Sequence, residues 1–89
     1  MRTFELEIIS PAKVVFKGKA QSVVVPAYEG KLGILGGHAP MVAQLKPGEI
    51  KVDGTVLFIV SDGFAEITQK RMRLFVEAAE EPADFRQKP

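Results

Sequence analysis

Short stretches in which apolar and polar residues alternate cover most of the chain. Phe4, Leu6 and Ile8 alternate with polar residues near the start, and residues 72–76 repeat the pattern near the end. A period of two sends alternate side chains to opposite faces of a β-strand, so each stretch predicts a strand with one face in water. Between them we expect further strands at residues 14–16, 21–25, 32–34, 50–52, 55–60 and 64–67. Residues 41–45 could form a strand or one helical turn, and we favour a strand because Pro40 and Pro47 bracket them.

Turn-forming residues separate these strands. Asp53-Gly54 is the two-residue signature of a type I′ hairpin. We expect Gly18 to turn the chain, and Pro26 to end its strand because proline donates no hydrogen bond to a strand ladder. Eight or more short strands with almost no helical periodicity predict an all-β domain, a small β-sandwich or flattened barrel.

Two of the predicted strands carry more apolar residues than one buried face requires. Residues 23–25 and 56–60 are apolar at successive positions and therefore on both faces of their strands. A strand of a two-layer domain usually has one face in water. The surplus predicts either an exposed apolar patch, which is typical of a binding surface, or cover by loops. The sequence leaves both open.

The stretch from Glu29 to Met41 is rich in glycine and yet apolar. It holds four of the eight glycines and the only histidine, together with Leu32 and Ile34. Such a segment is expected to fold against another surface rather than to act as a solvated linker. Its glycine spacing matches neither a dinucleotide-binding fingerprint nor a P-loop, which argues against phosphate binding.

Size and charge exclude several classes of protein. The 89 residues correspond to one domain, which we divide into a β-sandwich at 1–79 and a polar tail at 80–89. The net charge of +1, without a long basic run, argues against nucleic-acid binding. No apolar run approaches the ~20 residues of a membrane span, and no signal peptide is evident. The absence of cysteine fits a reducing compartment, and we expect a cytosolic protein or one assembled from the cytosolic side.

The residue types that carry chemistry are sparse. His38 is the only histidine, so a metal site would lack the partners that it needs, and no Ser or Thr is spaced to form a nucleophile–base pair with it. Asp53 and Asp62 precede glycines in predicted turns, and Glu66 fits a solvated strand position. We therefore expect no catalytic site, no metal and no cofactor.

The glycine-rich stretch also carries a family resemblance. The pattern Glu29-Gly-x-Leu-Gly-Ile-x-x-Gly-His-Ala-Pro40 is similar to one in the N-terminal domain of the epsilon subunit of rotary ATP synthases. The opening Phe4-x-Leu-x-Ile-Ile-Ser-Pro, Phe16-x-Gly18, Leu45-Lys-Pro-Gly48 and Val60-Ser-Asp-Gly-Phe-Ala-Glu66 resemble further signatures of that family. The likeness runs in order from about residue 3 to residue 79.

The resemblance implies a ten-stranded β-sandwich at the foot of the rotating central stalk. Such a subunit is not catalytic, packs on the gamma subunit and touches the ring of c subunits, so that ion translocation is coupled to ATP synthesis. By position, Glu29, Gly30, Lys31 and Leu32 match the loop that meets the ring, and Ser10, His38 and Ala43 match the stalk-facing side. From the apolar surplus we add Val24 and Leu57 to the gamma side. The expected location is the cytoplasmic face of a bacterial cell membrane, peripheral and within the complex.

Two departures from the family pattern stand out. Gly36 stands where proline is common, and the chain stops at Pro89 although family members often continue as a helical hairpin that can inhibit hydrolysis or bind ATP. A natural short form and a shortened chain are both compatible with this, as are proton and sodium coupling.

Two functions from other classes stay open. A free-standing β-sandwich that binds a peptide or a glycan would be expected to show a groove of exposed aromatic side chains, for which one tyrosine and no tryptophan offer little support. A small enzyme would depend on His38.

Overall fold

The computed structural model describes residues 2–82 and consists of ten strands, which confirms the predicted small all-β sandwich. The strands are β1 (Phe4–Ile9), β2 (Val14–Ala20), β3 (Ser22–Ala27), β4 (Gly30–Leu35), β5 (Met41–Leu45), β6 (Gly48–Val52), β7 (Thr55–Val60), β8 (Gly63–Ile67), β9 (Arg71–Val76) and β10 (Ala79–Glu80).

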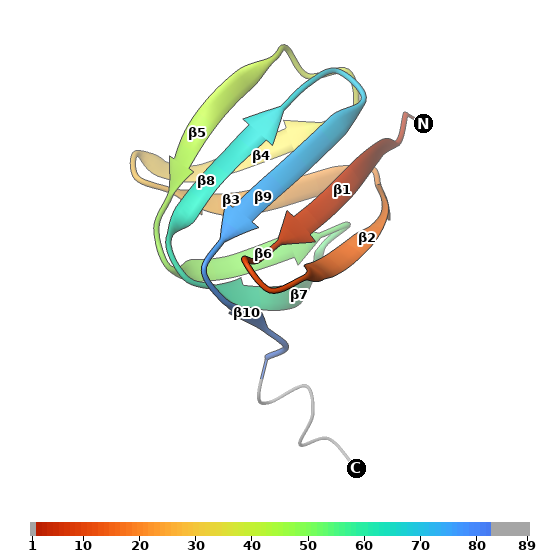
Figure 1. The fold of residues 1–89 in the computed structure, drawn as a ribbon. Helices are drawn as coiled ribbons and strands as arrows, with labels where there is room; N and C mark the ends of the chain where they lie inside the picture. Colours follow the sequence, from red (N-terminus) through yellow and green to blue (C-terminus); the bar gives the residue numbers. More distant parts are fainter. Residues whose placement is uncertain (1, 83–89) are drawn as a thin grey trace.

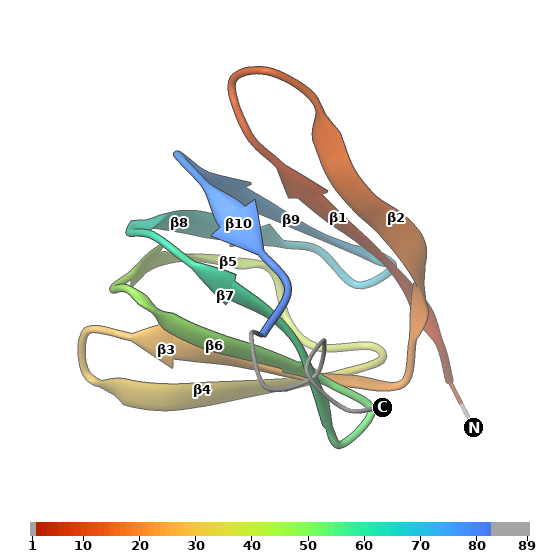
Figure 2. The same cartoon turned by 90° about the horizontal axis from the view of Figure 1, so that it is seen from below.

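The strands form two packed layers (Figures 1 and 2). Layer 1 has the order β5-β8-β9-β1-β2, and layer 2 has the order β4-β3-β6-β7-β10. Neighbouring strands are antiparallel except β1 and β9, which run parallel. The layers are joined at one corner, where Ala27 at the end of β3 pairs with Leu45 at the end of β5.

The core lies between the layers and follows the predicted alternation. Phe4, Leu6 and Ile8 point inward from β1, and their neighbours in β9 do the same. The largest fully buried side chains are Leu6, Ile8, Val23, Val25, Ile34, Leu45, Ile50, Ile67, Met72 and Leu74. Burial of one large aliphatic side chain stabilises a fold by roughly 1.5–3 kcal/mol. No polar or charged side chain is buried among the described residues, so the core gains this energy without a desolvation cost.

The predicted type I′ hairpin joins β6 to β7. Asp53 and Gly54 have φ values of 50° and 86°, the left-handed region that such a turn requires. The Asp53 carboxylate also accepts hydrogen bonds from the backbone N–H groups of Gln21 and Ser22, at 2.8 and 2.9 Å. These bonds fix the hairpin to the start of β3 and give Asp53 a structural role.

Gly36 lies in the turn between β4 and β5, in close contact with Arg2. The His38 N–H donates to the Leu35 carbonyl at 3.2 Å, and Gly37 has a φ of 82°, which together are typical of a type II turn. Proline is favoured at the second position of that turn, which is Gly36 here. A Cβ atom on Gly36 would come within 2.7 Å of the Arg2 Cβ, so a larger residue fits only if Arg2 moves.

Two strand boundaries differ from the prediction. Gly18 does not turn the chain; it lies within β2 opposite Leu6, with the Phe16 ring over the space that a side chain would need. Pro26 does not end β3, which continues to Ala27. The missing N–H of Pro26 costs no ladder bond, because β3 faces β6 only as far as Val24 on that side.

The end of the described chain is part of the sheet. β10 pairs through Ala79 and Glu80 with Val60 and Ile59 of β7, and Pro82 is buried. The strand thus crosses the predicted boundary between a domain at 1–79 and a tail at 80–89. Residues 83–89 lie outside the described part, and the division itself stays a prediction.

A glycine pair tests how closely neighbouring strands approach each other. A Cβ atom on Gly63 would collide with the backbone carbonyl of Phe75, whereas one on Gly33 meets no atom within 4 Å. We expect Gly63→Ala to lower the free energy of unfolding by about 1–3 kcal/mol, and Gly33→Ala to change it by about 0.5 kcal/mol at most. Urea unfolding monitored by circular dichroism measures both. Equal stability of the two variants would contradict the close approach of β8 to β9.

Candidate docking surfaces

The described residues offer no catalytic constellation. His38 lies in the turn after β4, where its Nδ1 is 2.7 Å from the Ala39 carbonyl oxygen. Between residues 2 and 82 no three His, Cys, Asp or Glu side chains are grouped to hold a metal ion. The same residues contain no helix that is long and apolar enough to cross a membrane.

The outer face of layer 1 carries a row of apolar side chains, which we call the aromatic stripe: Phe64, Phe75, Ile9 and Val14. Phe64 and Val14 are exposed, and Phe75 and Ile9 are half-buried. Successive members face one another on β8, β9, β1 and β2. The rings of Phe64 and Phe75 stack with their centroids 5.0 Å apart, and Phe64 remains 48% exposed. Exposed aromatic pairs of this kind are enriched where proteins bind one another.

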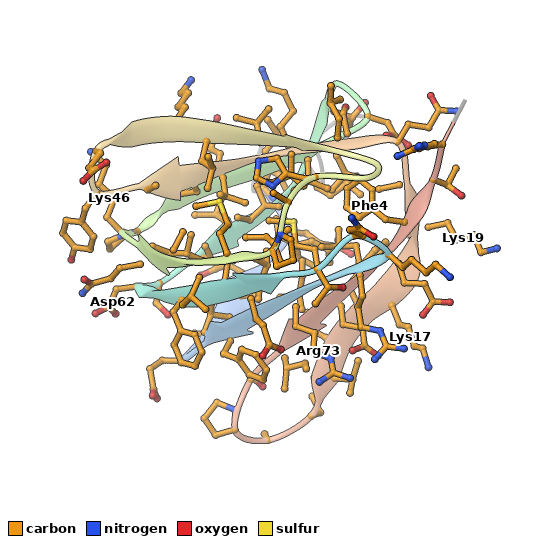
Figure 3. All side chains as sticks on the ribbon, turned by 90° about the horizontal axis from the view of Figure 1, so that it is seen from above. Phe4, Lys17, Lys19, Lys46, Asp62 and Arg73 are labelled. Atoms are coloured by element: carbon orange, nitrogen blue, oxygen red, sulfur yellow. The ribbon has the colours of Figure 1, made fainter. Side chains whose placement is uncertain are left out.

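A row of charged side chains runs beside the aromatic stripe across the same four strands. Arg73 donates through Nε to the Glu7 carboxylate at 3.1 Å, and its Nη1 lies 3.9 Å from Glu66. Lys17 lies 3.9 Å from the other oxygen of Glu7. Lys17 and Arg73 are labelled in Figure 3, on the outer side of layer 1. The Arg73–Glu7 pair is part-buried. Each of the more exposed pairs, Arg73–Glu66 and Lys17–Glu7, contributes at most about 1 kcal/mol to stability, so these pairs act mainly on orientation and specificity.

A shallow groove of about 400 Å³ lies along the aromatic stripe and is lined by Ile9, Phe64 and Phe75. Ser10 and Pro11 line it from the turn after β1, and Asp62 and Glu77 are its charged members. The groove therefore has an apolar floor and an acidic rim. An apolar centre with a charged border is the usual anatomy of a protein–protein interface.

The β3–β4 hairpin forms a second exposed feature. The residues at its tip, Tyr28 to Lys31, are all exposed, whereas Leu32 turns inward and packs against the core. A groove of about 410 Å³ runs between β4 and β5, and it is lined by residues 27–32 and 41–44. The structure thus brings the four predicted ring-contacting residues, Glu29, Gly30, Lys31 and Leu32, together with Ala43.

The residues predicted for the stalk side do not form one cluster. The strand registers put Ser10 and His38 at opposite ends of the sandwich, and Ala43 lies in the groove between β4 and β5. Val24 is half-buried on the outer face of layer 2. Leu57 packs against the core at the position where the register of β6 and β7 shifts. Of this set, Ser10 alone borders the aromatic stripe.

Sequence reasoning missed the stacked phenylalanines. Ala65 and Ile67 are buried in β8, so the period of two already sends Phe64 outward, on the same face as Glu66. In β9 the same rule sends Phe75 outward beside Arg73. Alternation thus places a phenylalanine at an outward position in each of these two strands.

The chain matches one family model, described as "ATP synthase, Delta/Epsilon chain, beta-sandwich domain", over residues 3–82. Among similar proteins, an ATP synthase epsilon chain of Bradyrhizobium sp. (strain ORS 278) is 43% identical over 82 residues, which cover 89% of this chain and 61% of the relative. One from Koribacter versatilis is 40% identical over 86 residues, with 93% and 61% covered. The chain thus spans less than two thirds of the length of these relatives.

Two solved structures share the fold. A chain of the Euglena gracilis mitochondrial ATP synthase (OSCP/F1/c-ring) superposes with a TM-score of 0.82 at 24% identity, covering 89% of this chain and 53% of the other. A chain of the Tetrahymena thermophila mitochondrial ATP synthase (central stalk/c-ring) gives a TM-score of 0.76 at 16% identity, with 96% and 71% covered. At these identities the likeness concerns the fold alone.

Proposed function

The chain belongs to the family of ATP synthase delta/epsilon β-sandwich domains, and on that premise we propose that it is a non-catalytic docking subunit of the rotary stalk. In this role it packs on the gamma subunit and touches the c-ring, so that ion translocation is coupled to ATP synthesis. The complex holds it at the cytoplasmic face of a bacterial membrane. It needs no cofactor for this.

The aromatic stripe is the observation that carries the proposal. The apolar surface of the stacked pair Phe64 and Phe75 is unfavourable while it is in contact with water. Its burial under a partner would therefore contribute favourably to binding. The neighbouring ion pairs supply the charged border. We assign the gamma contact to this face of layer 1, with Ser10 at its edge. Leu57 is left out, because a side chain that packs against the core is not available to a partner.

The hairpin tip supports the second contact. Glu29 and Lys31 are exposed at the tip of the β3–β4 hairpin, where they offer a partner charged groups. Lys46 and Asp62, at the same end (Figure 3), extend this polar rim. The solved structures that share the fold come from assemblies that include a c-ring, and this supports a c-ring as the partner of the tip.

One observation favours the second candidate, a free-standing module that binds peptides. The aromatic pair and the acidic groove next to it would accept an extended basic peptide. The two candidates differ in their partner. The stalk subunit binds gamma through a large surface, whereas a peptide module binds short basic peptides and ignores gamma.

A charge placed on the aromatic stripe should weaken gamma binding. Burial of one aromatic side chain contributes roughly 1.5–3 kcal/mol, so Phe64→Asp should weaken the complex at least about tenfold. Biolayer interferometry against immobilised gamma subunit measures the affinity. Because Phe64 is 48% exposed, the fold should survive, and circular dichroism checks this.

Val24→Asp is the matched control, because it places the same charge on the outer face of the other layer. We expect it to bind gamma like the parent. If Val24→Asp loses binding while Phe64→Asp retains it, the gamma surface lies on layer 2 as the sequence suggested. If the parent protein does not bind gamma at all, the proposed function is wrong.

A charge reversal at the hairpin tip should weaken the contact with the ring in a salt-dependent way. Lys31 carries a positive charge at the exposed tip, so the ring loop that it meets should offer an acid. A rim pair contributes about 0.2–1 kcal/mol and is screened by salt. Lys31→Glu should therefore reduce attachment to ring-containing membranes at low salt more than at high salt. Lys19→Glu, the same change away from the tip, is the control, and identical salt dependence in both variants and the parent would leave Lys31 a solvated residue.

A further inference from the structure

One long edge of the sandwich is closed and the other is open. On the closed side, Phe16 of β2 and Phe58 of β7 meet edge to face with their ring centroids 5.7 Å apart. On the open side, β4 and β5 face each other across the groove of about 410 Å³. β4 pairs with β3 along its whole length and with no other strand among residues 2–82. The other side of β4 is thus a free strand edge.

The registers identify which backbone groups point to this edge. The carbonyls of Ser22 and Pro26 accept bonds from Asp53 and Lys46, so the even-numbered residues of β3 turn away from β4. In an antiparallel pair, residues opposite such positions also turn away from the partner strand. Lys31 and Gly33, which face Pro26 and Val24, therefore direct both their N–H and C=O groups to the free edge.

β5, the opposite wall of the groove, also directs backbone groups toward the groove. The Gln44 carbonyl accepts from the Tyr28 N–H at 3.3 Å, so this residue of β5 turns its backbone away from β8 and toward the hairpin. Two residues earlier, Val42 has the same orientation, and its side chain is 68% exposed. Between the walls, Leu32 and Met41 are half-buried and pack against the core. A strand in this gap would find backbone partners at its side and an apolar floor beneath it.

Gly33 has no structural explanation within the domain. Its φ is not in the left-handed region, and a Cβ atom would meet nothing within 4 Å. Glycine inside a strand weakens the strand, and it often marks a site where another backbone approaches closely. At the middle of a free edge, a glycine gives an incoming strand unobstructed access to the N–H and C=O groups.

The edge of β4 also lacks the usual protection against strand pairing. Proteins shield exposed edges with lysines, prolines, bulges or very short strands. The edge strand β2 has Lys17 and Lys19 and a register shift against β1, and β10 has only two residues. β4 has one lysine, at its end, and its pairing with β3 is regular over six residues. This edge is open to a partner.

We propose that the free edge of β4 takes up an extended segment of the gamma subunit as an added strand. The added strand bonds to the backbone of Lys31 and Gly33, and its inward side chains, small and uncharged, lie over Leu32 and Met41. Val42 lines the groove and also belongs to the outer face of layer 1, diagonal to Phe64, so the added strand continues the surface proposed for gamma. The inference rests on the proposed function and names one part of its interface.

Hydrogen exchange of the backbone amides tests the added strand directly. The full chain is measured alone and in its purified complex with gamma, by mass spectrometry with fragments that separate residues 30–35. In the free chain the Lys31 and Gly33 amides are expected to exchange rapidly. In the complex they should slow by about tenfold or more, because each amide then donates to the added strand. If these amides exchange equally fast in both samples although gamma is bound, the inference is wrong and the proposed function stands.

Two substitutions at one position give an independent readout. Gly33→Pro removes an N–H that no residue of the described chain accepts, and Gly33→Ala keeps it. We expect Gly33→Pro to bind gamma about tenfold more weakly than Gly33→Ala, at similar stability in urea. Equal affinity of the two variants would overturn the proposal. Failure of the parent chain to bind gamma would instead reject the proposed function on which the inference rests.

Discussion

The apolar contact between the inner faces of the two layers holds every other feature of the molecule in place. All buried side chains of the described residues are apolar, and they come from alternate positions of the strands. Because the side-chain period is two, this contact also fixes which residues face outward. A slip of one residue in β8 would bury Glu66 and Phe64 and expose Ala65 and Ile67. The outer faces can therefore carry functional residues without any change in the core.

Much of the fold could be predicted because local rules and tertiary packing agree. The alternation in β1 and β9 and the Asp53-Gly54 turn depend on neighbours in the sequence, and they were predicted correctly. Gly18 and Pro26 were not, because their roles depend on distant residues. Gly18 is needed for the Phe16 ring, and Pro26 is tolerated because β3 no longer pairs with β6 at that point, on the side away from β4. Such positions are decided by packing across strands, which a single sequence does not display.

The docking surfaces were predictable only in part. The hairpin residues Glu29 to Lys31 followed from a family pattern and are exposed in the structure. The aromatic stripe was missed, although alternation points Phe64 outward, because its members come from two strand pairs, β1-β2 and β8-β9, that are far apart in sequence. Only the strand order β8-β9-β1-β2 brings them together. The free edge of β4 could not be predicted from the sequence either, because it depends on which strands lie beside β4 in the fold.

The central claim is that this rigid sandwich is a docking subunit of a rotary ATP synthase, and a pull-down from native membranes tests it most directly. The tagged full chain would be expressed in its own host, and the membrane extract would be purified in a mild detergent. The account predicts that gamma and c subunits are recovered with the parent chain, and that Phe64→Asp recovers much less gamma. Recovery of the tagged chain without any ATP synthase subunit would contradict it.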